Sequence, residues 1–371
     1  MNYLISGGGT GGHIFPAVSI ANALSELDKD ARILFVGALG RMEMERVPEA
    51  GYEIIGLPIR GFNRSQPWKN ISVLYDLARS LRQARRIVRE FKPDVAIGVG
   101  GYASGAAMKA AAWAGIPVLL QEQNGFAGVT NKLLRNDAAK ICVAYPNMER
   151  FFPADKIILT GNPVRANLTK GSAAAACAYF NEHFGTQFTE NRPTLLIIGG
   201  SLGAKTINES ILQGLNQLLN AGIQVIWQTG KTYYERCAKE AASVLPEHHN
   251  QLVVTAFLNN MPDAYALADV VISRAGASSI SELCLLGKAA ILVPSPNVAE
   301  DHQTHNAMAL VNQDAALLVK DTDAHLRLVP TALRLIENNE QCNLLRKNIL
   351  TLAQPDSARR IAEEVLRLVK R

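Results

Sequence analysis

Short apolar runs alternate along the chain with longer segments in which apolar residues recur at the helical period. The short runs predict β-strands, and the longer segments predict helices between them. Because most of the runs are continuously apolar, we expect strands that are buried on both faces of parallel sheets. The predicted strands are residues 3–6, 33–36, 53–57, 94–99, 117–121, 140–144 and 157–159, and then 194–198, 224–228, 252–256, 270–273, 290–293 and 316–319.

The two halves of the chain open in the same way. The strand at 3–6 leads into Gly7-Gly8-Gly9-Thr10-Gly11-Gly12, the strand at 194–198 leads into Gly199-Gly200-Ser201-Leu202-Gly203, and a helical pattern follows each. This pattern predicts an α/β protein of two Rossmann-like domains. We place the first domain at residues 1–162 and the second at 163–355, and we expect the last helix, 356–371, to pack back on the first domain.

Composition supports a folded protein of 371 residues, because 48% of them are hydrophobic and 19% are charged. The formal net charge of +5 is compatible both with nucleic-acid binding and with work at an anionic membrane surface. We expect no signal peptide and no membrane span, so any membrane contact would be peripheral. The cysteines are Cys142, Cys177, Cys237, Cys284 and Cys342. They form no C-x-x-C pair, which argues against a disulfide framework or a zinc site and favours a reducing cytosol.

The first glycine loop matches the G-x-G-x-x-G fingerprint of dinucleotide-binding proteins. Dinucleotide binding also requires an acidic residue at the end of the second strand, and the run Phe35-Val36-Gly37-Ala38 has none. An NAD-dependent oxidoreductase is therefore disfavoured. His13 follows the loop directly, either as a histidine that packs locally at a helix start or as a general base.

In the second half, a helix start rich in small residues follows the strand at 270–273. Glu282 lies about a turn into that helix, where a carboxylate can accept both hydroxyls of a ribose, although a solvated helical glutamate would look the same. A second polar helix start, Glu300-Asp301-His302-Gln303, follows the strand at 290–293. Such residues are often only caps, but ligands bind at the carboxyl ends of parallel strands, so we expect both segments at one site.

Several further motifs, taken in order, resemble the MurG family of peptidoglycan N-acetylglucosaminyltransferases over nearly the whole chain. They are Gly7–His13 with Ile14-Phe15-Pro16, Gly100-Gly101-Tyr102-x-Ser104-Gly105, Glu122-Gln123-Asn124, Gly161-Asn162-Pro163-Val164-Arg165, Gly199-Gly200-Ser201-x-Gly203-Ala204, Ser273-Arg274-x-Gly276-Ala277 with Glu282, and Gln303-x-x-Asn306-Ala307. The resemblance implies the GT-B fold, in which two Rossmann-like domains with parallel sheets face each other across a cleft.

The resemblance also implies the reaction and its partners. The enzyme would transfer N-acetylglucosamine from UDP-N-acetylglucosamine to the 4-hydroxyl of the muramyl sugar of lipid I, an undecaprenyl-diphosphate acceptor, with inversion, giving lipid II. It would serve cell-wall biogenesis, and through it cell shape and division, at the cytoplasmic face of the inner membrane. No metal and no cofactor are implied, and the sequence has no D-x-D carboxylate pair beside the second glycine loop.

Roles for individual residues follow from the same resemblance. On the donor side, Ser201 and Arg165 would hold the diphosphate, the Leu258 backbone with Ala277, Ser278 and Ser279 would frame the uracil, Glu282 would bind the ribose, and His302 or Gln303 would hold the sugar hydroxyls. On the acceptor side, the substrate-binding residues would be Thr10, Gly11, Gly12, Tyr102 and Asn124, with His13 as the catalytic base. The segment Asp301-His302-Gln303 stands where the family has paired glutamines, which leaves the roles of His302 and Gln303 open.

A basic amphipathic helix is predicted over residues 71–91. Leu74, Leu77, Leu81 and Val88 would share one face, beside a stripe of Arg79, Arg82, Arg86 and Arg89. The stripe is either a docking surface for an anionic membrane or a solvated face; nucleic-acid binding is disfavoured because no aromatic residues interleave with the arginines. One alternative is another GT-B protein with the same UDP site, such as a UDP-N-acetylglucosamine 2-epimerase or a lipid-modifying transferase. A second alternative is a non-catalytic sugar-nucleotide-binding module.

Overall fold

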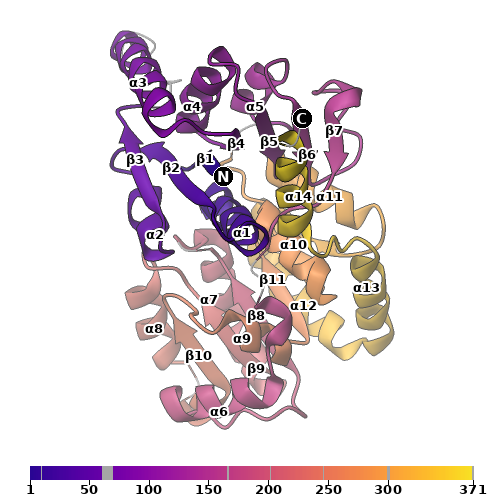
Figure 1. The fold of residues 1–371 in the computed structure, drawn as a ribbon. Helices are drawn as coiled ribbons and strands as arrows, with labels where there is room; N and C mark the ends of the chain where they lie inside the picture. Colours follow the sequence, from indigo (N-terminus) through magenta and orange to yellow (C-terminus); the bar gives the residue numbers. More distant parts are fainter. Residues whose placement is uncertain are drawn as a thin grey trace. The chain divides into compact units, whose positions relative to one another are not determined.

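The computed structural model describes residues 1–9, 11–60, 70–164, 167–200, 202–244, 246–298 and 301–369. The chain divides into two compact units. One comprises residues 1–165 together with 354–371, and the other comprises residues 166–353. Each unit contains its own parallel sheet flanked by helices (Figure 1).

The sheet of the first unit has the order β3-β2-β1-β4-β5-β6-β7. Its central strands are mostly apolar and almost entirely buried, because helices cover both faces. The order changes direction between β1 and β4, which is where open α/β sheets bind their ligands. The strands are β1 Asn2–Gly7, β2 Arg32–Ala38, β3 Glu53–Leu57, β4 Val95–Gly100, β5 Val118–Glu122, β6 Lys140–Val143 and β7 Ile157–Leu159.

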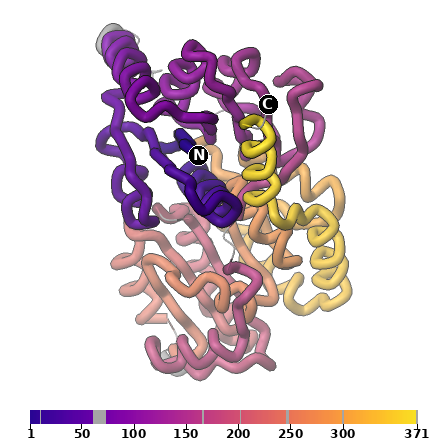
Figure 2. Tube along the Cα trace, in the orientation of Figure 1, coloured from indigo at the N-terminus to yellow at the C-terminus, as the bar shows by residue number. Residues whose placement is uncertain are grey.

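The helices of the first unit include one from the far end of the chain. The C-terminal helix α14 lies beside α1, which follows the first strand (Figure 1, Figure 2). Ile361, Ala362 and Val365 are fully buried in the core shared with α1, and burial of each large apolar side chain contributes about 1.5–3 kcal/mol. The helices are α1 Gly11–Leu27, α2 Glu43–Glu49, α3 Asn70–Phe91, α4 Tyr102–Trp113, α5 Val129–Leu134, the short 3₁₀ helix Ala154–Lys156, and α14 Ser357–Val369.

The second unit repeats this plan with the order β10-β9-β8-β11-β12-β13, which reverses between β8 and β11. Its strands are β8 Thr194–Ile198, β9 Gln224–Gln228, β10 Leu252–Thr255, β11 Val270–Ser273, β12 Ala289–Leu292 and β13 Leu317–Leu318. Its helices are α6 Ala173–Phe184, α7 Lys205–Asn220, α8 Tyr234–Ala242, α9 Met261–Leu267, α10 Ala277–Leu286, α11 His302–Val311, α12 Ala324–Glu337 and α13 Asn339–Thr351, with short 3₁₀ helices at Leu168–Lys170, Pro246–Gln251 and Asp321–Asp323.

Every predicted strand is present, and the largest difference in the bounds is at β2, predicted at 33–36 and observed as Arg32–Ala38. The face predicted for the basic helix is partly wrong. Leu74 is 56% exposed, whereas Val73, Ala84, Ile87 and Val88 form the buried side of α3. Successive residues of an α-helix are about 100° apart, so Leu74 points well away from the direction of Val73.

Candidate functional site

The predicted acceptor-side residues lie at one edge of the first sheet. The neighbouring strands β1, β4 and β5 end at Gly7, Gly100 and Glu122, and parallel strands bring these ends to the same edge. Three short segments follow them and contain all the predicted acceptor-side residues that the structure describes: Gly11, Gly12 and His13 after β1, Tyr102 after β4, and Asn124 after β5. Thr10 lies outside the described residues.

His13 is half-buried in the first turn of α1, and its ring is held from two directions. Its Nδ1 atom lies 3.0 Å from the carbonyl oxygen of Gly8. A carbonyl oxygen can only accept, so Nδ1 carries a proton, and in the neutral form of the ring the lone pair is on Nε2. The ring also packs on Gly100, where a Cβ would lie 2.9 Å from His13 Nε2. This tautomer is the one that a general base acting through Nε2 requires.

The loop that carries His13 rests on a carboxyl group that the sequence analysis missed. Glu43, the first residue of α2, is completely buried. Its Oε2 accepts a hydrogen bond from Gly9 N–H at 2.9 Å, and its Oε1 accepts one from Ala38 N–H at 3.0 Å. The acidic residue that follows the second strand thus turns inward to the glycine loop. No feature of the local sequence distinguishes it from a solvated glutamate at a helix start.

The loop after β5 is ordered around a second buried carboxyl group. Glu122 accepts hydrogen bonds from the backbone N–H of Asn124 at 3.1 Å and of Gly128 at 3.0 Å, and from the Asn131 side chain at 2.9 Å. Burial raises the pKa of Glu122, and these hydrogen bonds oppose the rise. Asn124 itself is half-buried, and its side chain also donates to Glu122. Tyr102 differs from these groups because it is 54% exposed.

The predicted donor-side residues lie at the corresponding edge of the second sheet. Leu258 follows β10, α10 follows β11, and α11 follows β12. These segments bring together Leu258, the first α10 residues Ala277, Ser278 and Ser279, then Glu282, and the first α11 residues His302 and Gln303. Ser201 and Arg165 lie outside the described residues.

Glu282 is nearly buried, with 9% of its surface exposed, and the Tyr265 hydroxyl donates a hydrogen bond to its Oε2 at 3.0 Å. Close by in the first turn of the same helix, the buried Oγ of Ser278 has no hydrogen-bond partner among the described residues. A held carboxylate and an unused hydroxyl at a helix start suit a polyhydroxyl ligand such as a ribose.

Gln228 is a further residue that the sequence analysis missed. It ends β9 and is 2% exposed. Its side chain donates to the carbonyl of Gly200 at 3.2 Å and accepts from the N–H of Leu258 at 3.0 Å. Gln228 therefore joins the second glycine loop to the loop that was predicted to frame the uracil. A polar residue at the carboxyl end of a buried strand was the available signal.

The side-chain oxygen of Gln303 is already hydrogen-bonded within the protein, because its Oε1 accepts from the N–H of Ser295 at 2.8 Å. Its amide nitrogen is the group with which it could hold a sugar hydroxyl. His302 begins α11, directly after Asp301, whose φ of 49° is left-handed. The two neighbours therefore differ in what they can offer a ligand, an amide nitrogen from Gln303 and an imidazole from His302.

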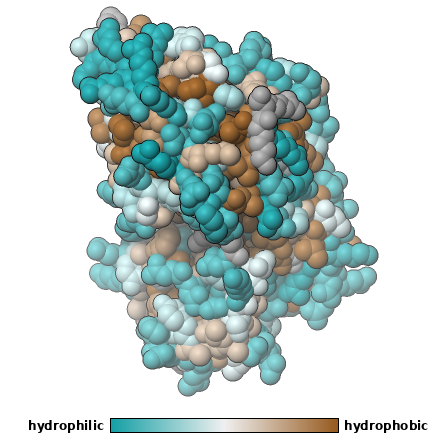
Figure 3. Space-filling view, in the orientation of Figure 1, coloured by the Kyte–Doolittle hydropathy of each residue, from teal (hydrophilic) through white to brown (hydrophobic). Residues whose placement is uncertain are grey.

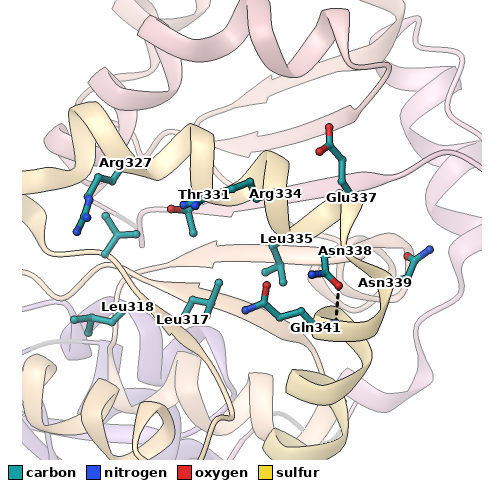
Figure 4. Close-up of a pocket in the computed structure, with 11 residues that line it drawn as sticks. Leu317, Leu318, Arg327, Thr331, Arg334, Leu335, Glu337, Asn338, Asn339 and Gln341 are labelled. Atoms are coloured by element: carbon teal, nitrogen blue, oxygen red, sulfur yellow. Dashed lines mark hydrogen bonds between the residues drawn. The ribbon is translucent and has the colours of Figure 1, made fainter.

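A pocket of about 750 Å³ lies elsewhere in the second unit, between the edge strand β13 and helices α12 and α13 (Figure 4). Leu317, Arg327, Arg334 and Asn338 are among its lining residues, and none of the predicted site residues lines it. The described part of the chain contains no group of three or more His, Cys, Asp or Glu side chains that could hold a metal ion. Within the same residues, no helix is long and apolar enough to cross a membrane.

Comparison with known families identifies the class. Residues 3–143 match the glycosyltransferase family 28 N-terminal domain, and residues 194–364 match the C-terminal domain of the same family. The chain therefore belongs to glycosyltransferase family 28. Within it, the chain is similar along its whole length to the transferases known as MurG, which confirms the predicted family and the predicted two-domain parallel α/β fold.

Three comparisons illustrate the similarity. The UDP-N-acetylglucosamine--N-acetylmuramyl-(pentapeptide) pyrophosphoryl-undecaprenol N-acetylglucosamine transferase of Bacteroides thetaiotaomicron is 58% identical over 100% of this chain and 98% of its own length. The crystal structure of Acinetobacter baumannii MurG superposes with a TM-score of 0.78 at 27% identity, covering 99% of both chains. A UDP-GlcNAc 2-epimerase from Neisseria meningitidis shares only the fold, with a TM-score of 0.67 at 16% identity over 99% of this chain and 100% of its own.

Proposed function

We propose that this protein transfers N-acetylglucosamine from UDP-N-acetylglucosamine to the 4-hydroxyl of the muramyl sugar of lipid I, forming lipid II with inversion at the anomeric carbon. The observation that carries the proposal is the 58% identity, over the entire chain, with a transferase named for this donor and acceptor. Two sets of polar residues, each at the carboxyl edge of a parallel sheet, support it.

The donor would be bound by the second unit. Glu282, held by Tyr265, would accept the ribose hydroxyls, and the Ser278 hydroxyl would supply a further hydrogen bond. The N–H of Leu258 is bonded to Gln228, so its carbonyl is the backbone group for the N–H of a uracil ring. We propose the diphosphate for the N-terminal end of α7, with Ser201 and Arg165, and the sugar hydroxyls for Gln303 and His302.

The acceptor would be bound by the first unit. Gly11 and Gly12 open α1, and a helix start offers unpaired N–H groups and a favourable dipole to an anionic substrate such as the lipid diphosphate. We propose Thr10 and Asn124 for contacts with the reacting sugars and the exposed Tyr102 ring for packing against the acceptor. Small residues at 11 and 12 let the substrate approach the backbone closely.

We propose His13 as the general base. Its Nε2 would take the proton of the acceptor 4-hydroxyl while that oxygen bonds to the anomeric carbon and the bond from this carbon to the diphosphate breaks. UDP leaves with the electron pair of that bond. The position of His13 at a helix start disfavours the imidazolium and so keeps the ring able to accept a proton. If His13 is not the base, Asn124 and its neighbour Glu122 are the next candidates.

We propose α3 as part of a surface that docks on the anionic cytoplasmic leaflet of the inner membrane. The exposed side of the helix combines Leu74 and Tyr75, which are 56% and 65% exposed, with a row of arginines. The surface over α3 is mostly hydrophilic (Figure 3). Each cation near an anionic surface contributes about 1 kcal/mol of attraction. The exposed arginines are Arg79, Arg82, Arg85, Arg86 and Arg89.

The decisive experiment is incubation with radiolabelled UDP-N-acetylglucosamine and a short-chain lipid I analogue. The expected product is the labelled disaccharide-lipid, in amounts that depend on both substrates. Conversion of the donor into its 2-epimer without acceptor would identify an epimerase instead. Binding of UDP with no turnover under any condition would identify a sugar-nucleotide-binding module. Either result would refute the proposed function.

A further inference from the structure

One peptide group of the first glycine loop is hydrogen-bonded at both of its ends. The carbonyl of Gly8 lies 3.0 Å from His13 Nδ1, and the N–H of Gly9 donates to Glu43 Oε2 at 2.9 Å. The Gly8 carbonyl and the Gly9 N–H belong to the same planar unit and point in opposite directions. Glu43, the peptide and the His13 ring therefore form a continuous hydrogen-bonded row.

The Gly8–Gly9 peptide is closely surrounded, and the Gly7–Gly8 peptide before it is hydrogen-bonded as well. The N–H of Gly8 donates to the carbonyl of Gly100 at 3.3 Å. A Cβ on Gly8 would lie 2.1 Å from Glu43 Oε1, and a Cβ on Gly101 would lie 2.6 Å from the Gly8 carbonyl oxygen, so the peptide is packed tightly on two sides. Glu43 is fixed in turn by the N–H of Ala38. The glycines thus make room for a close carboxyl–peptide contact as well as a turn.

We propose that Glu43 is the positioning residue for His13 and acts through the Gly8–Gly9 peptide. The inference rests on the proposed role of His13 as the base. A carboxyl group that accepts from the N–H of a peptide polarises it and strengthens its carbonyl as an acceptor, by about 10–30% per bond in such chains. The stronger acceptor holds the proton on Nδ1 and makes Nε2 more basic. The logic is that of a carboxylate that orients a histidine directly, with one peptide interposed.

Other titratable groups lie on the elements around the loop. They are Glu26 at the far end of α1, Glu45, Arg46 and Glu49 on α2, and Tyr102 and Lys109 on α4. Arg46 is paired with Glu49, and Lys109 with Asp137. Glu43 differs from these groups because it is buried and hydrogen-bonded to the backbone of the loop. Glu45 is exposed on the same helix, which makes Glu45→Gln a matched control for the loss of one negative charge.

The kinetic test compares Glu43→Gln with Glu45→Gln. A carboxamide can accept only one of the two N–H bonds, so Glu43→Gln should lower kcat by about 10- to 100-fold, the range found for groups that orient metal-binding histidines from the outer shell. The acidic limb of the pH–rate profile should move to lower pH, because a weaker acceptor on Nδ1–H makes Nε2 less basic. The UDP affinity of Glu43→Gln should remain at the parental value, and so should the kcat of Glu45→Gln.

A spectroscopic test needs no turnover. The full-length protein is labelled with ¹⁵N-histidine, and the NMR signals of His13 are identified by their loss in His13→Gln. The parent should carry the His13 proton on Nδ1. Glu43→Gln should show more of the Nε2–H form. A parent in the Nε2–H form, or a Glu43→Gln variant with parental tautomer and pH limb, would overturn the proposal. If His13→Gln keeps full turnover while the tautomer shift is observed, the base assignment fails and the positioning by Glu43 stands.

Discussion

Replacement of Gln228 by leucine should weaken UDP binding although Gln228 itself is too buried to touch the nucleotide. Its side chain is 2% exposed and joins the carbonyl of Gly200 to the N–H of Leu258. These two loops are the ones that we propose for the diphosphate and the uracil of UDP. Leucine keeps the approximate volume and removes both hydrogen bonds, so the two loops would no longer be tied to each other.

The structure sets the scale of the effect. The N–H of Leu258 is buried, whereas Gly200 is exposed, so water can replace Gln228 at its carbonyl. A buried N–H left without a partner costs about 1–3 kcal/mol, and the free energy of unfolding should fall by about that amount. If about 1–2 kcal/mol of the binding free energy is then needed to order the two loops, the affinity for UDP falls about 5- to 30-fold.

The same strand supplies a matched control. Gln224, at the start of β9, is completely buried and bonds to Thr189 and Thr194, about 13 Å from Gln228 along the strand. Gln224→Leu should cost at least as much stability by thermal or urea unfolding, because Gln224 makes more hydrogen bonds, while UDP affinity, measured by calorimetry, stays unchanged. Equal UDP affinities in the two variants would refute the argument and leave Gln228 with a purely structural role.

Three further predictions follow from other parts of the molecule. Glu282→Ala should weaken UDP binding by about 1.5–3 kcal/mol, the value of a charge-assisted hydrogen bond, and unchanged affinity by calorimetry would exclude the ribose contact. Reversal of Arg82, Arg86 and Arg89 to glutamate should reduce sedimentation with anionic vesicles and spare turnover of a water-soluble acceptor; equal vesicle binding would favour a solvated face. Burial lowers the pKa of Lys288 to about 8 from its ordinary 10.5, so the unfolded chain binds more protons between these values. The stability of the parent should therefore rise relative to Lys288→Met as the pH increases from 8 to 10, and parallel pH–stability curves would contradict this account.

The alternation of apolar runs with helical segments was sufficient to predict the strands of both sheets. A strand that is buried on both faces must be apolar along its length, and this is a local property of the sequence. The same local reasoning failed on α3, where a spacing of three and four residues grouped the exposed Leu74 with the partly buried Leu77 and Leu81. Which side of a helix is buried depends on the surface it packs against, and Leu74 is 56% exposed.

The sequence by itself determined the two-domain parallel fold, the glycine loops and the position of His13 behind the first of them, because each depends on neighbouring residues or on a short motif. Only the tertiary structure decided that Glu43, thirty-four residues beyond Gly9, turns inward to bond that loop, that Gln228 joins two loops, and that α1 is the helix of the first unit against which α14 packs. These contacts join segments distant along the chain. The role of a buried carboxyl or amide depends on the backbone groups that packing brings within hydrogen-bonding distance, and a local sequence pattern does not predict these contacts.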